Sequence, residues 1–243
     1  MAKLDPEAAL NQFAAWLERL LAARLRSLIA YGSYTGGNHH GEHSDINLLC
    51  VLDRVDGATL DQVAEALRWW TGQGRAPVVL LSEAELRDAA DVFPIEYLDI
   101  QRNHRLLKGE DLVASLPHDP RLHRLQVERE LRAKLVKLRA GYVGRQKDGK
   151  AIEALLLESF STFVTLFRHA LAAVGEPLLL AKEEVIAAAA RRFDFAAEPF
   201  QAVLNARREA RRLPRDLAAI RPIFAGYHDA IQRVERALEA HGA

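Results

Sequence analysis

The sequence predicts a two-domain protein: an α/β N-terminal domain with a mixed sheet and flanking helices, followed by an all-α C-terminal helical bundle. Short apolar runs alternate with helical patterns in the first half of the chain, whereas the second half has almost no strand signal. Pro117 and Pro120 mark the change between the two compositions. We therefore expect an α/β domain over residues 1–118 and a helical domain over residues 119–243.

The first elements follow from apolar spacing. Leucine and phenylalanine recur at helical intervals after Pro6, which is tolerated in a first helical turn because its missing N–H has no partner there. Two short apolar runs bounded by glycine and aspartate predict buried strands, and a later repeat of three and four ending at Gly72 and Gly74 predicts a helix. The expected elements are a helix over residues 5–26, strands over 27–31, 46–52 and 77–81, and a helix over 57–74.

The next stretch begins with a clear signal and ends with an ambiguous one. Ser82 followed by Glu85 is the signature of a capping box, so we expect a short helix that reaches Asp91. Residues 93–111 fit both an alternating strand and a helix, and we predict a strand. Residues 108–111 have the composition of a turn.

The second half of the chain is rich in alanine, leucine, arginine and glutamate, which favour helices. Glycine and proline interrupt it at intervals, and a bundle of four or five helices is expected. The helical segments are 122–142, 151–174, 182–191, 198–213 and 217–240. Aromatic residues at helical spacing, Phe160, Phe163 and Phe167, are expected in the core together with Trp69 and Trp70 of the first domain.

Charge and cysteine content exclude several classes of protein. Lys plus Arg and Asp plus Glu both number 33, so no global basic field favours nucleic acid as a partner. The single Cys50 lies in an apolar run and cannot form an internal disulfide, which suits a reducing cytoplasm. The N-terminus has no targeting pattern, and no apolar run approaches the roughly 20 residues that span a bilayer. We expect a cytoplasmic protein without membrane segments.

The segment between the first two expected strands carries the chemistry. A strand that ends in Gly32-Ser33 can present backbone N–H groups and a hydroxyl to a phosphate, because glycine allows close approach of the backbone. Asp45 opens the next strand, where a carboxylate can hold Mg²⁺ against the same phosphates. Gly-Ser turns are common, so the phosphate interpretation depends on the two features occurring together.

Gly32-Ser33, the loop through Gly36 and Gly37, and the run Ser44-Asp45-Ile46-Asn47-Leu48-Leu49 resemble the signature of the nucleotidyltransferase superfamily, the DNA polymerase β-like proteins. The order of the two domains is similar to that of small bacterial members such as aminoglycoside adenylyltransferases. The resemblance implies that Gly32 and Ser33 bind the triphosphate of ATP or another NTP donor. It also implies that positions 45 and 47 hold Mg²⁺ or Mn²⁺, and that an acid on a later strand completes the site.

Two departures from this pattern concern the acids. The second metal position is Asn47, whose neutral oxygen attracts a hard divalent cation less than a carboxylate does. The expected third strand, residues 76–81, contains no acid, and Glu83 and Glu85 follow its end. We choose Glu96 over Asp99 as the third acid, because Glu96 lies between apolar neighbours, where an unpaired acid is unusual. An exposed edge acid is the alternative.

Histidines near the motif allow a further metal hypothesis. His39, His40 and His43 stand with Glu42 just before Asp45, and imidazoles there would add ligands that offset the missing carboxylate. Adjacent histidines point their rings apart, which favours a solvated loop instead.

Two patterns in the second half are compatible with other roles. Basic residues crowd the segment 121–139, where they would bind polyanions or form a solvated face interleaved with acids. Arg221 and His228 have a spacing similar to that of helical ribonuclease toxins, although we expect Pro222 and Gly226 to interrupt the helix between them.

The leading hypothesis is a nucleotidyltransferase that moves NMP from NTP·Mg²⁺ to a hydroxyl of a small molecule or protein. Asp45, Asn47 and Glu96 would be its catalytic residues, Gly32 and Ser33 would bind the nucleotide, and Asp45 and Asn47 would hold the metal. The alternative is a catalytically degenerate nucleotide-binding or protein-interaction protein of the same fold. The sequence does not identify the acceptor, and it leaves homodimer formation open.

Overall fold

The computed structural model describes residues 5–32, 46–208 and 212–242. The chain forms two compact units, Met1–Asp119 and Pro120–Ala243.

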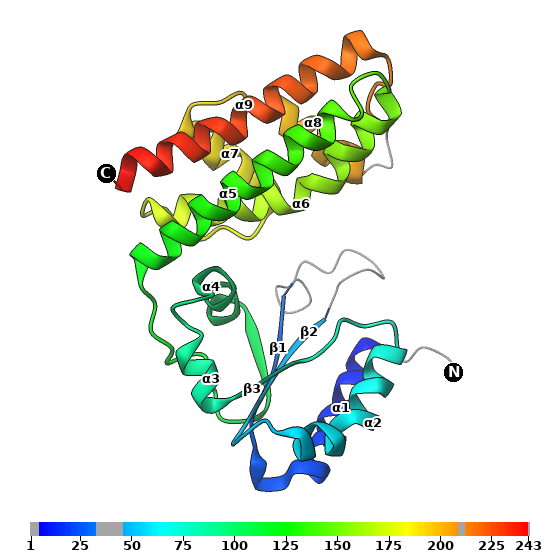
Figure 1. Ribbon diagram of the computed structural model, residues 1–243, viewed down its shortest axis with the longest axis vertical. Coiled ribbons are helices and arrows are strands. Elements are labelled where there is room, and N and C mark those ends of the chain that lie inside the picture. Colours follow the sequence, from blue (N-terminus) through cyan, green and yellow to red (C-terminus); the bar gives the residue numbers. More distant parts are fainter. Residues whose placement is uncertain (1–4, 33–45, 209–211, 243) are drawn as a thin grey trace. The chain divides into compact units, whose positions relative to one another are not determined.

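The N-terminal unit is built on a four-stranded mixed sheet (Figure 1). Its strands are β1 (Leu25–Tyr31), β2 (Asn47–Leu52), β3 (Val79–Ser82) and β4 (His104–Gly109), in the spatial order β3-β2-β1-β4. β1 runs antiparallel to both β2 and β4, whereas β3 pairs with β2 in parallel. The first three strands match the predicted ones to within two residues.

Helices cover both faces of the sheet, as Figure 1 shows. α1 (Pro6–Leu21) and α2 (Gly57–Gly72) lie on one face, and α3 (Glu83–Asp88) and α4 (Pro94–Arg102) lie on the other. A 3-10 turn, η1 (Ala22–Arg24), joins α1 to β1. Successive apolar residues of the strands point to opposite faces of the sheet, so both faces pack against helices. Leu28 and Leu48 face α1 and α2, whereas Ile29 and Leu49 face α3 and α4.

Capping explains where the first helices begin. Asp5 accepts hydrogen bonds from the backbone N–H groups of Glu7 and Ala8, at 3.1 and 3.2 Å, directly before Pro6. The predicted capping box is confirmed in α3, where the Ser82 hydroxyl caps the Glu85 N–H and the Glu85 carboxylate accepts the Ser82 N–H at 2.7 Å. Trp70 is fully buried and donates its indole N–H to the Ala76 carbonyl at 2.9 Å, as a buried tryptophan requires.

The prediction of a strand from residue 93 onward is wrong for its first part. Residues 94–102 form helix α4, and the strand begins only at His104. Pro94 occupies the first turn of α4, where its fixed φ favours a helix, and the spacing of three between Ile95 and Leu98 buries both side chains. The apparent alternation through Tyr97 therefore came from a helix with a broad apolar face.

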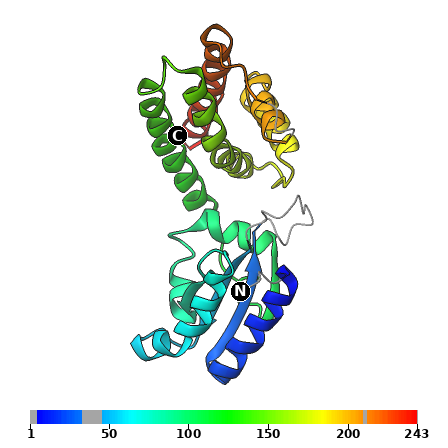
Figure 2. The same ribbon diagram turned by 90° about the vertical axis from the view of Figure 1, so that its right-hand side faces the viewer.

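The C-terminal unit contains the five predicted helices, which pack around α6 (Figure 1, Figure 2). They are α5 (Pro120–Val143), α6 (Gly149–Ala173), α7 (Lys182–Phe193), α8 (Glu198–Arg208) and α9 (Leu217–Gly242). The expected helix 198–213 is too long, because residues 212–215 are not helical. Phe160, Phe163 and Phe167 are buried as predicted, and Phe200 stacks on Tyr227 with ring centroids 4.1 Å apart.

The expected interruption between Arg221 and His228 is also wrong, since α9 continues through Pro222. Pro222 lies inside the helix, in its second turn, so its missing N–H removes one i→i−4 hydrogen bond, and the 26-residue helix continues in spite of that loss. Gly226 allows α8 to approach, because a Cβ at this position would lie 2.6 Å from the Pro199 ring.

A buried carboxylate fixes the segment that leads into α9. Glu153 of α6 accepts hydrogen bonds from the Leu213 N–H at 3.0 Å and from Arg215 Nε at 2.7 Å. The Glu153 side chain is 6% exposed, whereas that of Arg215 is 38% exposed. The buried carboxylate therefore has hydrogen-bond partners, while the guanidinium stays partly hydrated.

Candidate functional site

Three polar side chains form a row across the strand ends where the predicted phosphate-binding turn begins. Tyr31, the last residue of β1, pairs with Asn47 at the start of β2 and with His104 at the start of β4. Directly opposed residues of antiparallel strands project to the same face of a sheet. Asn47, Tyr31 and His104 therefore share one face, at the edge that precedes Gly32.

That face is the one covered by α4. Tyr31 packs against the apolar cluster that contains Ile29, Leu49 and Tyr97, and Tyr97 belongs to α4. Because Asn47 lies opposite Tyr31, it faces the same side as α4. A sequence-based prediction of strands alone does not give this relationship, which depends on the pairing of β1 with β2.

Gly32 has the backbone conformation that only glycine adopts readily. Its φ of +95° lies in the left-handed region, so β1 turns sharply immediately after Tyr31. The Gly32 carbonyl accepts a hydrogen bond from Nδ2 of Asn103 at 3.1 Å. Asn103 directly follows α4, so this helix and the turn are joined by one side chain.

Glu96 lies close to this face although it is not on a strand. Burial and the nearby Glu96 carboxylate raise the pKa of Tyr31 above its ordinary value. Burial, Glu96 and Tyr31, in that order, raise the pKa of Tyr97. The exposed Glu96 carboxylate thus acts electrostatically on two tyrosines beside the Gly32 turn, which keep their hydroxyl protons at neutral pH.

The third strand brings no carboxylate to the row. Leu49 of β2 pairs with Val79 of β3 in parallel, so continuing that register by two residues places Pro77 beside Asn47. Glu83 and Glu85 follow the opposite end of β3. The Glu85 carboxylate caps α3, where hydrogen bonds from Ser82 lower its pKa.

Several residues that were proposed from the sequence as site residues lie outside the described ranges. These are Ser33, His39, His40, Glu42, His43 and Asp45. Among the described residues no group of three or more histidine, cysteine, aspartate or glutamate side chains is arranged to hold a metal ion. The metal hypotheses for Asp45 and for the histidines therefore stay predictions.

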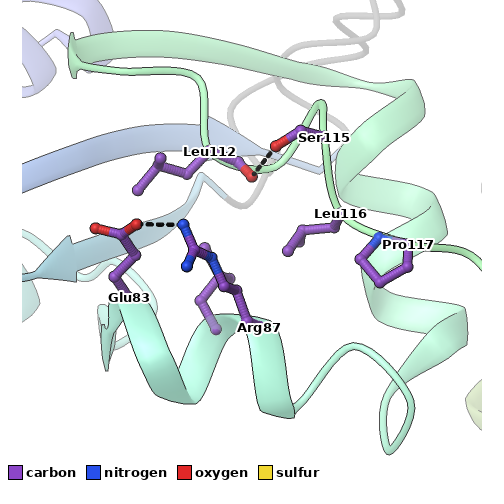
Figure 3. Close-up of a pocket in the computed structure, with 7 residues that line it drawn as sticks. Glu83, Arg87, Leu112, Ser115, Leu116 and Pro117 are labelled. Carbon is purple, nitrogen blue, oxygen red and sulfur yellow. Dashed lines mark hydrogen bonds and ion pairs between the residues drawn. The ribbon is translucent and has the colours of Figure 1, made fainter.

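A small cavity of about 240 Å³ lies elsewhere in the N-terminal unit (Figure 3). Glu83 and Arg87 of α3 form an ion pair at 2.6 Å on one side of it, and the chain from Leu112 to Pro117 forms the other. Ser82, which precedes Glu83, pairs with Leu52, whereas Asn47 is at the opposite end of β2. The α3 side of the cavity therefore lies at the other end of β2 from Asn47.

Charged residues of α5 are engaged in ion pairs on the surface of the helical unit. Arg132 contacts Glu128, Glu235 and Glu239 at 3.2, 2.8 and 3.1 Å, which agrees with a solvated charged face for this part of the helix. Arg139 donates to Nε2 of His228 at 2.9 Å, and burial and this guanidinium lower the pKa of His228. Arg221 instead donates to the Gln146 carbonyl, so Arg221 and His228 have separate partners.

Tyr31, Tyr97, Asn103 and His104 lie at this site and were not predicted from the sequence. Tyr31 has a recognisable signal, since it immediately precedes the Gly-Ser turn. Asn103 has none, because an asparagine between two elements is usual in any turn.

No protein-family model matches the sequence, and no curated protein matches it in a sequence search. Among solved structures the chain is similar to spectinomycin adenyltransferase AAD(9) from Enterococcus faecialis, which was crystallised with ATP and spectinomycin. The TM-score is 0.57 at 14% identity, and the match covers 95% of this chain and 100% of that chain. The fold is therefore a nucleotidyltransferase-like α/β domain followed by a helical bundle, as the sequence predicted. None of the helices within the described ranges has the length and apolar character needed to cross a membrane.

Proposed function

We propose that the protein is a nucleotidyltransferase, which transfers NMP from ATP or another NTP to a hydroxyl group of a small molecule or protein. The observation that carries this proposal is the row at the strand ends, where the left-handed Gly32 follows Tyr31 and Asn47 lies directly opposite. The likeness of the fold to an adenyltransferase that binds ATP supports the same assignment.

The roles of the residues follow from the chemistry of phosphoryl transfer. Backbone donors at Gly32 and Ser33, with the Ser33 hydroxyl, bind the triphosphate. The acceptor oxygen forms a bond to the α-phosphorus, the bond from that phosphorus to the oxygen bridging to the β-phosphate breaks, and pyrophosphate leaves. Glu96 takes the proton of the acceptor hydroxyl, as a carboxylate on the face that carries Tyr31.

The donor set suits one divalent cation that arrives with the nucleotide. Mg²⁺ is commonly held by one or two carboxylates together with substrate phosphates and water, and Asp45 supplies one carboxylate. Asn47 adds a neutral amide oxygen on the face of Tyr31. When bound, Mg²⁺ or Mn²⁺ would neutralise charge on the phosphates.

Pyrophosphate release from ATP tests the proposal. The purified protein is incubated with ATP, Mg²⁺ or Mn²⁺ and a panel of hydroxylated acceptors that includes spectinomycin, and labelled product is sought by mass spectrometry. We expect Asp45→Asn to abolish release. Asp53→Asn is the matched control, because Asp53 is exposed and pairs with Arg24 at the far end of β2. Loss of activity in both variants, or in neither, would contradict the assignment of Asp45.

A second function, nucleotide binding without transfer, is favoured by one specific observation. Asn47 replaces the second acid that the resemblance implies, and residues 76–81, where the third acid was expected, contain no carboxylate. In this case calorimetry detects ATP binding while no acceptor yields pyrophosphate. A gain of transfer by Asn47→Asp would then identify Asn47 as the limiting residue.

A further inference from the structure

The cavity beside α3 has an apolar part and a charged part (Figure 3). The apolar lining consists of Leu86 from α3 and of Leu112, Leu116 and Pro117 from the segment 112–117. Leu86 and Leu116 are buried in the apolar cluster on the α3 side of the sheet, and Leu112 packs against that cluster. This part of the cavity therefore offers a dry surface to an apolar group.

Hydrogen bonds hold the segment that forms the second wall of the cavity. Nε2 of Gln101 in α4 donates to the carbonyls of Val113 and Leu116 at 3.0 and 2.8 Å. The Asp111 carboxylate accepts the Ala114 N–H at 3.2 Å, and the Leu116 N–H donates to the Val113 carbonyl at 3.2 Å. The wall is thus formed before any ligand arrives, and binding would not have to order it.

The charged part consists of two guanidinium groups and two carboxylates. Glu83 contacts Nη2 of Arg87 at 2.6 Å and Nε of Arg26 at 3.3 Å, and Nη2 of Arg26 lies 3.8 Å from the Glu110 carboxylate. The four formal charges cancel. Because Glu83 already has two cationic partners, a cationic ligand would gain little from this carboxylate.

Arg87 is the group that can recognise a ligand at the cavity. Figure 3 shows its guanidinium between Glu83 and Leu116. Its Nη2 donates to Glu83, and the described residues give this side chain no other hydrogen-bond partner. The remaining N–H donors are planar and match the two oxygens of a carboxylate. A phosphate dianion would bring a second negative charge close to Glu83 without a further cation to balance it.

We propose that this cavity binds a small monocarboxylic acid with a compact apolar body, its carboxylate on Arg87 and its apolar body against Leu86, Leu112 and Leu116. The cavity volume of about 240 Å³ limits the apolar body to roughly a phenyl ring with a short side chain. This ligand is additional to the nucleotide and acceptor of the proposed transferase, because the α3 side of the cavity lies at the other end of β2 from Asn47.

NMR of leucine methyl groups tests the site, with phenylacetate as the probe and phenylacetamide as its neutral match. We expect phenylacetate to shift the signals of Leu86, Leu112 and Leu116 with a dissociation constant of about 1 mM. Phenylacetamide should bind about tenfold more weakly, because it cannot form charge-assisted hydrogen bonds with Arg87. Inorganic phosphate should leave these signals unchanged.

Three variants separate the roles of charge and shape. In Arg87→Gln, which removes the cation, phenylacetate should bind as weakly as phenylacetamide. Leu112→Phe enlarges a side chain of the wall and should abolish binding of both probes. Arg54→Gln is the matched control, because Arg54 pairs with Asp56 at 3.2 Å and is 71% exposed, whereas Arg87 is 69% exposed. This control should bind phenylacetate as the wild type does.

The outcomes decide the inference without any measurement of ATP turnover. Equal binding of acid and amide by the wild type would overturn it, as would an absence of methyl shifts at saturating probe. Unchanged affinity in Arg87→Gln, or equal weakening in Arg54→Gln, would also overturn it. Phosphate shifts as large as those of phenylacetate would show unselective pairing with an exposed arginine. Loss of an exposed ion pair costs little stability, so Arg87→Gln decides if Leu112→Phe does not fold.

Discussion

Replacing Gly32 with alanine tests the backbone conformation and the nucleotide site together. Gly32 has φ of +95°, and a left-handed conformation costs about 1–2 kcal/mol for a residue with a Cβ. The hydrogen bond from Asn103 opposes relaxation of the turn. We expect Gly32→Ala to lower the free energy of unfolding by about 1–2 kcal/mol and to weaken ATP binding at least about tenfold, because the turn proposed to bind phosphate would change its conformation.

Gly175→Ala supplies the matched control. Gly175 has φ of +87° in the helical unit, and no atom lies within 4 Å of the position that its Cβ would take. The variant therefore introduces the same backbone strain without a steric contact and without touching the strand ends. Its loss of stability should equal that of Gly32→Ala, while its ATP affinity should match the wild type.

Urea unfolding and calorimetry measure the two effects. Tryptophan fluorescence follows the N-terminal unit, because Trp16, Trp69 and Trp70 are the three tryptophans of the chain, and far-UV circular dichroism follows the helices. Unchanged ATP affinity in Gly32→Ala would refute the phosphate-binding role of the turn. Unchanged stability would refute backbone strain at this position. A loss of ATP affinity in Gly175→Ala would show that destabilisation alone accounts for the effect.

Three further predictions concern groups whose surroundings are known. Glu96→Gln should lower the pKa of Tyr31, measured by phenolate absorbance, and an unchanged titration would place Glu96 away from the site. The folded-state pKa of His228 is lowered, so its contribution to stability is present above the unfolded pKa of about 6.5 and is lost as pH falls through the folded value. In His228→Gln the free energy of unfolding, measured with urea, should therefore fall less between about pH 7 and pH 5. Glu153→Ala should destabilise the helical unit by about 3 kcal/mol in unfolding followed by circular dichroism. This value is at the lower end for a broken buried ion pair, because Arg215 is partly hydrated. A loss under about 1 kcal/mol would contradict a stabilising role for this pair.

The sequence was sufficient for elements whose apolar period is unambiguous. Each C-terminal helix has a long 3.6-residue repeat and a glycine or proline near its ends, so all were located to within a few residues except the end of α8. Residues 94–102 failed because a short segment with apolar residues on most sides fits both periods. Pro94 at the first turn was the signal that would have decided for a helix.

The candidate site was only partly accessible from sequence. Gly32 could be identified because a glycine at the end of a buried strand commonly marks a sharp turn of the backbone. The row through Asn47, Tyr31 and His104 depends on strand order and register, which no local pattern encodes. Asn103 was missed for the same reason, since its partner lies 71 positions away.

The parallel register of β2 and β3 also sets which position could carry a further acid beside residue 47. Pro77 is exposed and precedes the first residue of β3, so a carboxylate at that position would remain hydrated and would remove no hydrogen bond of the sheet. Asn47 differs from aspartate by a single side-chain group. Carboxylates introduced at positions 47 and 77 would therefore lie beside each other at the ends of adjacent strands, and the sheet could gain an acidic pair without a change of fold.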